Sequence, residues 1–261
     1  MSRYLNQPTL YVDFLRPKRM RFDNPGGGIG GGKNALGESV STDFSGGGII
    51  TGTYEQCVIF GQDAGDDERH EYVNMLGARL NGGFRFINVP IVNDGIGPFP
   101  VIDGKRRPII KGIQHSDGSF FSDDSGYSQA TVWAKLRSAA ALNAGQIQIR
   151  IYGAARDLRW SDWFSIYHDQ NGDKSKGWRT YRYWESNKTA EGSEVVSGVA
   201  LSYKDYTLGI SPPLREATVA NTRIEVARPM CVMKFADGFT LPFEYESYYQ
   251  ARPTLSFVEA F

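Results

Sequence analysis

The chain is poor in the residues that usually build metal and redox sites. It has only 2 cysteines and 3 histidines among 261 residues. Cys57 and Cys231 lie far apart, without CxxC spacing or a nearby histidine, so we expect neither a disulfide framework nor a structural zinc site. We expect each cysteine to be a small apolar core residue. This usage fits synthesis in a reducing cytoplasm.

A net charge and long apolar runs are missing as well. Lys+Arg and Asp+Glu both number 29, so the formal net charge is zero. This balance gives no general attraction to nucleic acid or to an anionic membrane. No apolar run approaches the roughly 18 residues that a bilayer-spanning helix needs. Residues 1–15 lack the basic and apolar regions of a signal peptide. We expect neither a membrane nor a specific nucleic acid as a partner.

Glycine and aromatic residues are abundant instead: 30 Gly, 15 Phe, 14 Tyr and 5 Trp. Aromatic residues favour strands, and glycines suit the tight turns between them. After a region rich in Pro and Gly at residues 93–107, turn signals recur about every ten residues. The sequence predicts a mostly β protein with two domains that resemble sandwiches or barrels. The first covers residues 1–107 and has one helix on a sheet, and the second covers residues 108–261 and ends in a strand.

Two segments stand out in the first domain. Residues 26–48 are so rich in glycine that ordering them costs much backbone entropy, so we expect a long flexible loop that contacts a neighbouring molecule. Residues 66–81 predict a helix, because acidic residues occupy the first turn and Val73, Leu76 and Leu80 follow at helical spacing. Gly82 and Gly83 end it.

The second domain contains clear strand patterns. Residues 146–152 alternate with a period of two, whereas residues 131–142 fit either a short helix or a strand. The aromatic segments 162–169 and 178–185 flank a polar turn and predict a hairpin. Because adjacent strand residues point to opposite faces, we expect Trp163 to lie opposite Trp184 on the buried face, as an aromatic pair.

Motifs that could carry chemistry are incomplete. Residues 27–34 fit the phosphate-loop pattern GxxxxGK[ST] except that Asn34 replaces the hydroxyl residue, and no strand and helix flank them, so we interpret the segment as a loop. Asp169, Asn171 and Asp173 alternate as calcium ligands do, but Lys174 and Thr180 stand where a calcium loop has its glycine and its closing Glu.

No catalytic signature is complete either. The sequence has no HExxH or GxSxG motif, and the Asp66-Asp67 and Asp123-Asp124 pairs fit solvated turns or caps better than a glycosidase pair. We therefore expect no enzyme activity and no cofactor. Four tryptophans that are close in sequence leave a carbohydrate platform open beside the core interpretation, namely Trp160, Trp163, Trp178 and Trp184.

Three phrases of the second half resemble tail proteins of siphophages, the phages with long non-contractile tails. They are DLRWSDWFSIYHD, then WRTYRYWE, then ISPPLREATVANTRIEVARPMCVMKF. The closing ARPTLSFVEAF and the earlier FRFINVP are also similar to segments of such proteins. The resemblance covers most of residues 50–261. The family pattern has a glycine where this chain has Asp162-Trp163, and the turn before Trp178 is longer.

The resemblance implies a structural protein of the virion, made in the host cytoplasm and located in the tail. It would form a ring, a hexamer by family resemblance, at the distal end that joins the tail tube to the baseplate or hub. Its partners would be its own copies and the tube, tape-measure and hub proteins, with DNA passing through the lumen. A tail-tube or hub-associated subunit and a carbohydrate-binding β protein remain alternatives. The expected assembly residues are Gly26, Gly27, Gly28, Gly30, Gly31, Gly32 and Lys33.

Overall fold

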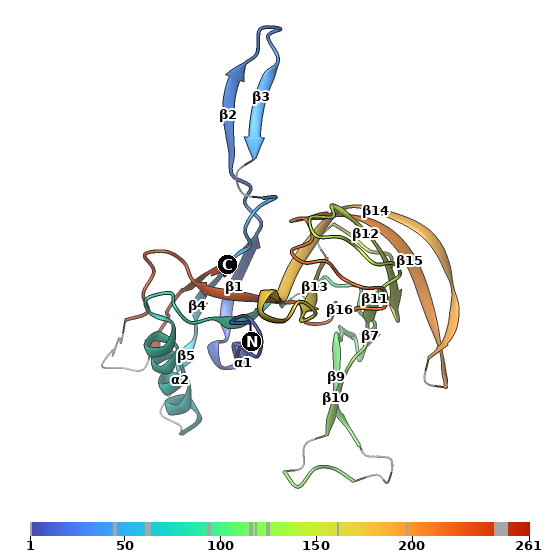
Figure 1. The fold of residues 1–261 in the computed structure, drawn as a ribbon. Coiled ribbons are helices and arrows are strands. Elements are labelled where there is room, and N and C mark those ends of the chain that lie inside the picture. The colour runs from blue at the N-terminus through green and yellow to red at the C-terminus, as the bar shows by residue number, and fades with distance from the viewer. Residues whose placement is uncertain are drawn as a thin grey trace. The chain divides into compact units, whose positions relative to one another are not determined.

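The chain folds into two compact units that consist mostly of β-strands, as the sequence predicts (Figure 1). The computed structural model describes residues 2–43, 46–60, 64–92, 95–114, 117, 119–123, 126–160, 162–196, 198–242 and 250–261. Unit 1 consists of residues 1–90 and 231–261, and unit 2 of residues 91–230. The predicted division at residue 107 differs from this one, because the end of the chain returns to pair with strands of unit 1.

A five-stranded sheet forms the centre of unit 1, with the strand order β1-β4-β19-β17-β6. The pairs β1–β4, β4–β19 and β19–β17 are antiparallel. Tyr54, Phe235 and Phe257 are buried, and the Phe257 ring lies 6.2 Å from that of Tyr54 and 5.4 Å from that of Phe235. The strands are β1 (Pro17–Asp23), β4 (Thr51–Cys57), β6 (Ile87–Pro90), β17 (Met230–Phe235) and β19 (Leu255–Glu259).

The predicted helix of unit 1 is confirmed as α2 (Ala64–Leu80). Val73, Leu76 and Leu80 are buried, and the helix contacts the short helix α1 (Val12–Leu15) and the strand β5 (Ile59–Phe60). Strand β5 pairs with β18 (Gln250–Ala251). None of the helices in the described ranges is long and apolar enough to cross a membrane.

The glycine-rich segment corrects one prediction, because it forms a hairpin and not a flexible loop. Strand β2 (Gly28–Lys33) pairs antiparallel with β3 (Ser39–Asp43), and Figure 1 shows the hairpin standing clear of the unit 1 sheet. The Asn34 side-chain oxygen accepts hydrogen bonds from the amides of Leu36 and Glu38 at 3.0 and 2.9 Å. This turn chemistry specifies the hairpin without a packed core.

A closed barrel forms the centre of unit 2, with the strand order β11-β12-β15-β14-β13-β16. It closes because β16 pairs with both β11 and β13. Residues 131–142, which the sequence left open between helix and strand, contribute β11. The strands are β11 (Trp133–Leu136), β12 (Gln146–Tyr152), β13 (Trp163–His168), β14 (Gly177–Val196), β15 (Val199–Ser211) and β16 (Arg223–Glu225).

Alternating side chains fill the barrel. Phe164 and Ile166 of β13 and Tyr181 and Tyr183 of β14 belong to one buried apolar cluster, which also takes in Ile149 and its neighbours on β12. The Phe164 and Tyr181 rings stack across the two strands at 5.6 Å. The strand predicted from the period-two pattern of residues 146–152 is confirmed, with one face pointing inward and the other outward.

Strands β14 and β15 continue beyond the barrel as a long hairpin. Strand β14 pairs with β13 only over residues 177–182, whereas its pairing with β15 runs to Val196. Arg150 of β12 holds the hairpin by two hydrogen bonds to Asp205, at 2.8 and 2.9 Å, and one to Glu194 at 2.9 Å. Hydrogen bonds from Tyr152 and Arg150 lower the pKa of Glu194 to about 2.

Shorter elements complete unit 2. The strands β7 and β8 form one two-stranded ribbon and β9 and β10 another, and a 3-10 turn follows β13. The bounds are β7 (Val101–Ile102), β8 (Lys105–Arg106), β9 (Ile109–Ile113), β10 (Tyr127–Ala130) and η1 (Gly172–Lys174).

Candidate functional site

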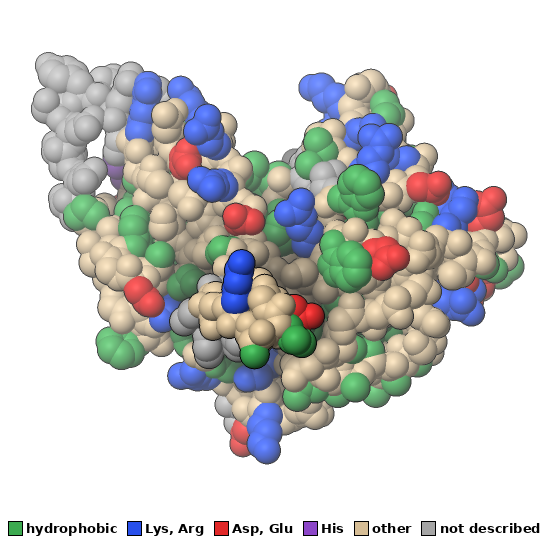
Figure 2. Space-filling model, turned by 90° about the horizontal axis from the view of Figure 1, so that it is seen from above, with side chains coloured by type: hydrophobic (Ala, Val, Ile, Leu, Met, Phe, Trp, Pro, Cys, Tyr) green, Lys and Arg blue, Asp and Glu red, His purple; other side chains and the backbone are tan. Residues whose placement is uncertain are grey.

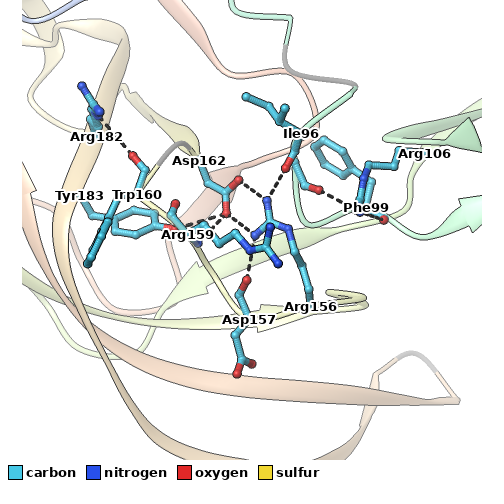
Figure 3. Close-up of polar contacts among 11 residues, drawn as sticks. Ile96, Phe99, Arg106, Arg156, Asp157, Arg159, Trp160, Asp162, Arg182 and Tyr183 are labelled. Carbon is cyan, nitrogen blue, oxygen red and sulfur yellow. Dashed lines mark hydrogen bonds and ion pairs between the residues drawn. The ribbon is translucent and has the colours of Figure 1, made fainter.

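The described residues of the loop between β12 and β13 are anchored by an ion pair and by several hydrogen bonds. Asp162, which is 1% exposed, stands just before β13 and pairs with Arg156 in a bidentate ion pair, with oxygen–nitrogen distances of 2.6 and 2.8 Å. Figure 3 shows the Arg156 guanidinium between this carboxylate and the carbonyl groups of Ile96 and Asp157. Bidentate, charge-assisted pairs of this kind hold a loop in one geometry.

Asp162 also accepts hydrogen bonds from within the loop. Its Oδ2 atom accepts the amide of Arg159 at 2.9 Å, and the Tyr183 hydroxyl lies 3.3 Å away and donates to the Arg159 carbonyl oxygen (Figure 3). Burial, with the negative charge of Asp162, raises the pKa of Tyr183. The phenol is therefore a neutral donor at ordinary pH, and it joins the loop to the barrel wall.

The loop has further attachments to neighbouring strands. Asp157 accepts hydrogen bonds from Lys204 Nζ at 2.8 Å and from the Tyr206 hydroxyl at 2.9 Å, and these two bonds lower the pKa of Asp157. Arg182 of β14 donates to the carbonyl oxygen of Trp160 at 3.3 Å (Figure 3). The backbone of Arg159 and the carbonyl group of Trp160 are thereby held by bonds that do not involve the indole.

A second tryptophan lies on the adjacent strand. The pairing of β14 with β15 shifts between Tyr183 and Glu185, which places Trp184 in a β-bulge. Tyr183 faces the barrel core, and Trp184 is 63% exposed. A Cβ atom built on Gly209 of β15 would lie 2.9 Å from both Cε2 and Cζ2 of Trp184, so the indole covers that glycine. Because glycine has no side chain, the indole can lie close against the backbone of β15.

Trp160 and Trp184 line the same groove, which has a volume of about 500 Å³. Trp160 is 69% exposed. The remaining lining residues are Leu158, Arg159, Glu185 and Ser186. Two aromatic faces with a carboxylate, a guanidinium and a hydroxyl nearby can bind a ligand that has both apolar and hydroxyl-rich surfaces. This groove is the candidate functional site, and we call it the Trp160–Trp184 groove.

The predicted Trp163–Trp184 pair is wrong. Trp163 is opposite Arg182 in the register, with the guanidinium carbon 5.8 Å from the indole centroid, and it is buried, whereas Trp184 is exposed. The turn between the strands pairs His168 with Gly177, so the regular register ends at Trp163–Arg182 and Trp184 lies beyond the residues that pair with β13. The aromatic pair that does cross this hairpin on the inner face is Phe164 with Tyr181.

The predicted assembly residues lie on the β2–β3 hairpin and the segment that enters it. Residues 30–39 are all exposed. A turn and a strand follow Lys33, not a helix, so the phosphate-loop pattern has no helix N-terminus behind it. Alternation in residues 39–43 and the turn residues Asn34 and Gly37 are the signals that predict a hairpin here.

The calcium-like turn is exposed. Asp169, Asn171 and Asp173 all face solvent around η1, and Ser175 Oγ accepts the Asn171 amide at 2.9 Å. Within the described ranges, no three His, Cys, Asp or Glu side chains come together as a metal site would require. Calcium binding by this turn stays a prediction.

Sequence reasoning missed a buried polar cluster at one end of the barrel. His168 Nε2 lies 2.8 Å from the Tyr181 hydroxyl, which accepts the amide of Arg215 at 3.0 Å. Burial, reinforced by the positive charge of Arg179, lowers the pKa of His168 to about 3. A neutral, enclosed imidazole of this kind serves the fold. Cys57 and Cys231 are both buried in unit 1, as predicted, and burial raises the pKa of Cys57 to about 12.

No protein-family model and no curated protein sequence matches the chain.

Proposed function

We propose that this protein is a structural subunit of a long-tailed bacteriophage virion, which forms a ring at the distal end of the tail and joins the tube to the baseplate or hub. The sequence resemblance of residues 50–261 to siphophage tail proteins suggests the particle. The β2–β3 hairpin is the structural observation that carries the proposal.

The β2–β3 hairpin has little to stabilise it alone. Its strands form a two-stranded sheet, and its described side chains from Gly30 to Ser39 are exposed. An isolated two-stranded hairpin is marginally stable in water, because it has no apolar face to bury. Its outer edges carry unpaired amide and carbonyl groups, which readily add a strand from another chain. A neighbouring subunit that accepts the hairpin would supply the missing contacts.

Other parts of the molecule support assembly over catalysis. The β9–β10 ribbon is a second two-stranded, largely exposed hairpin. Acidic and basic side chains are both among the exposed side chains in Figure 2. Such a mixed surface suits contacts with several protein partners, and single-sign surfaces suit nucleic acid.

Native mass spectrometry and negative-stain imaging test the proposal. The full chain should form a closed ring, a hexamer by the family resemblance, and an antibody against it should label the distal end of the tail. Replacing residues 26–47 with a short turn should weaken the ring. Lys33→Ala is the matched control and should leave the ring intact, because one exposed charge contributes little. A chain that stays monomeric inside the particle contradicts the proposal, and labelling along the whole tube favours the tail-tube alternative.

A further inference from the structure

We propose that the Trp160–Trp184 groove is a carbohydrate-binding site, which takes an oligosaccharide of pyranose rings with mainly equatorial substituents. This inference does not depend on the proposed ring. It rests on two exposed indoles, on their preformed positions and on the polar groups beside them.

The exposure of both indoles requires an explanation. Tryptophan has the largest apolar side chain, and Trp160 and Trp184 are 69% and 63% exposed in one groove. Single exposed apolar residues are common, but two large aromatic rings in one hollow are typical of a binding surface. Tyr181 and Tyr183, on the same strand as Trp184, are buried in the barrel core. The barrel therefore does accommodate aromatic side chains, and Trp184 nevertheless lies outside it.

Described backbone groups near both indoles are anchored before any ligand arrives. The Asp162–Arg156 pair and the Arg182–Trp160 hydrogen bond fix the backbone that bears Trp160. The bulge places Trp184 on the outer face of the barrel, and the missing Cβ of Gly209 leaves room for its indole against β15. A site that is already ordered loses little conformational entropy on binding, which matters most for weakly bound, flexible ligands.

The chemistry of the lining selects the class of ligand. The axial faces of an equatorially substituted pyranose expose C–H bonds that carry partial positive charge, and these lie flat on the negative face of an indole. Its hydroxyl groups need both acceptors and donors at the rim. Glu185 supplies carboxylate acceptors, Arg159 supplies donors, and Ser186 supplies both.

The same lining argues against two other ligands. Single-stranded nucleic acid also stacks on aromatic rings, but it needs a basic groove for its phosphates, and the lining here has one arginine and the carboxylate of Glu185. A protein partner buries about 800 Å² on each side, so it would also have to contact residues beyond the six that line this hollow.

Tryptophan fluorescence titration of the full chain with cellotetraose and N-acetylchitotetraose tests the proposal. At least one should give a saturable change in emission at millimolar concentration. Maltotetraose, whose axial linkages bend the chain, should bind more weakly. Trp160→Ala and Trp184→Ala should each weaken binding about tenfold or more, as loss of one stacking contact does. Phe84→Ala removes an aromatic ring that is 90% exposed elsewhere and should have no effect.

The contrary outcomes are distinct. No spectral change with either equatorial tetrasaccharide overturns the proposal, and so does equal binding of maltotetraose or of both tryptophan variants. If Trp160→Ala instead lowers self-association in native mass spectrometry and the sugars have no effect, the groove is a protein contact. If the unmodified protein forms the ring but does not bind the sugars, the proposed function stands and only the carbohydrate-binding inference is wrong.

Discussion

The indole of Trp184 lies directly over Gly209 on the neighbouring strand, close enough that a Cβ atom there would come within 2.9 Å of Cε2 and Cζ2 of the ring. Gly209→Ala must therefore displace the indole. The two indole atoms can move away, but Glu185 Cβ also lies 3.3 Å from the added atom, so we expect the barrel to stay folded with a loss of stability of about 1–3 kcal/mol. Tryptophan emission and sugar affinity should change. Gly145→Ala is the matched control, because no atom lies within 4 Å of its added Cβ.

Trp163 and Trp184 should respond in opposite ways to truncation. Trp163 is 9% exposed, so Trp163→Ala should lower the free energy of unfolding by about 3 kcal/mol or more. Trp184→Ala, at an exposed position, should lower it by less than about 1 kcal/mol. Chemical denaturation of the two variants beside the parent measures both values. Equal losses for the two would contradict the register described for β13 and β14.

The Asp162–Arg156 pair should contribute strongly to stability and to the Trp160 loop. Asp162→Ala leaves a guanidinium that is 12% exposed without its carboxylate, which should cost about 3 kcal/mol. The loop should also become more accessible to protease. Asp237→Ala breaks the Lys234–Asp237 pair, in which the aspartate is 90% exposed, and should cost less than about 0.5 kcal/mol. Similar melting of both variants would refute an anchoring role for Asp162.

His168 should make the protein sensitive to mild acid. The unfolded chain binds a proton at this group near pH 6.5, whereas the folded chain keeps it neutral down to about pH 3. Within that window the unfolded state binds more protons, so stability falls as the pH falls. We expect a loss of about 2 kcal/mol between pH 6.5 and about pH 5, above the range in which carboxyl groups titrate.

His168→Gln separates this contribution from the rest of the chain. The variant keeps a polar group beside Tyr181 but has no proton to take up, so its stability should be nearly flat over the same pH interval. Denaturant midpoints at several pH values give the slopes, and an unchanged slope in His168→Gln would sink the assignment.

The sequence predicts the parts of this fold that local patterns encode. Acidic residues and apolar spacing identify α2, alternation identifies β12, and two aromatic segments around a polar turn identify the β13–β14 hairpin. The turn residues Asn34 and Gly37 indicate the hairpin at residues 28–43, whereas the high glycine content of the same segment favours a flexible loop.

Non-local features are not encoded in this way. The bulge at Trp184 lies beside Gly209 of β15, a residue 25 positions later in the chain. The Asp162–Arg156 pair joins two residues of an irregular loop, where no periodicity applies. The sequence therefore identifies Trp160 and Trp184 as notable residues, but it does not predict that they line one groove.

The position of β19 between β4 and β17 has a consequence for how the chain is made. The unit 1 sheet lacks an inner strand until residues 255–259 have been synthesised, whereas every barrel strand of unit 2 ends by residue 225. On the ribosome, unit 2 can therefore close its barrel while the edges of β4 and β17 still wait for their shared neighbour. The nascent chain exposes those edges until β19 is synthesised, so we expect a chaperone to act at this stage of synthesis.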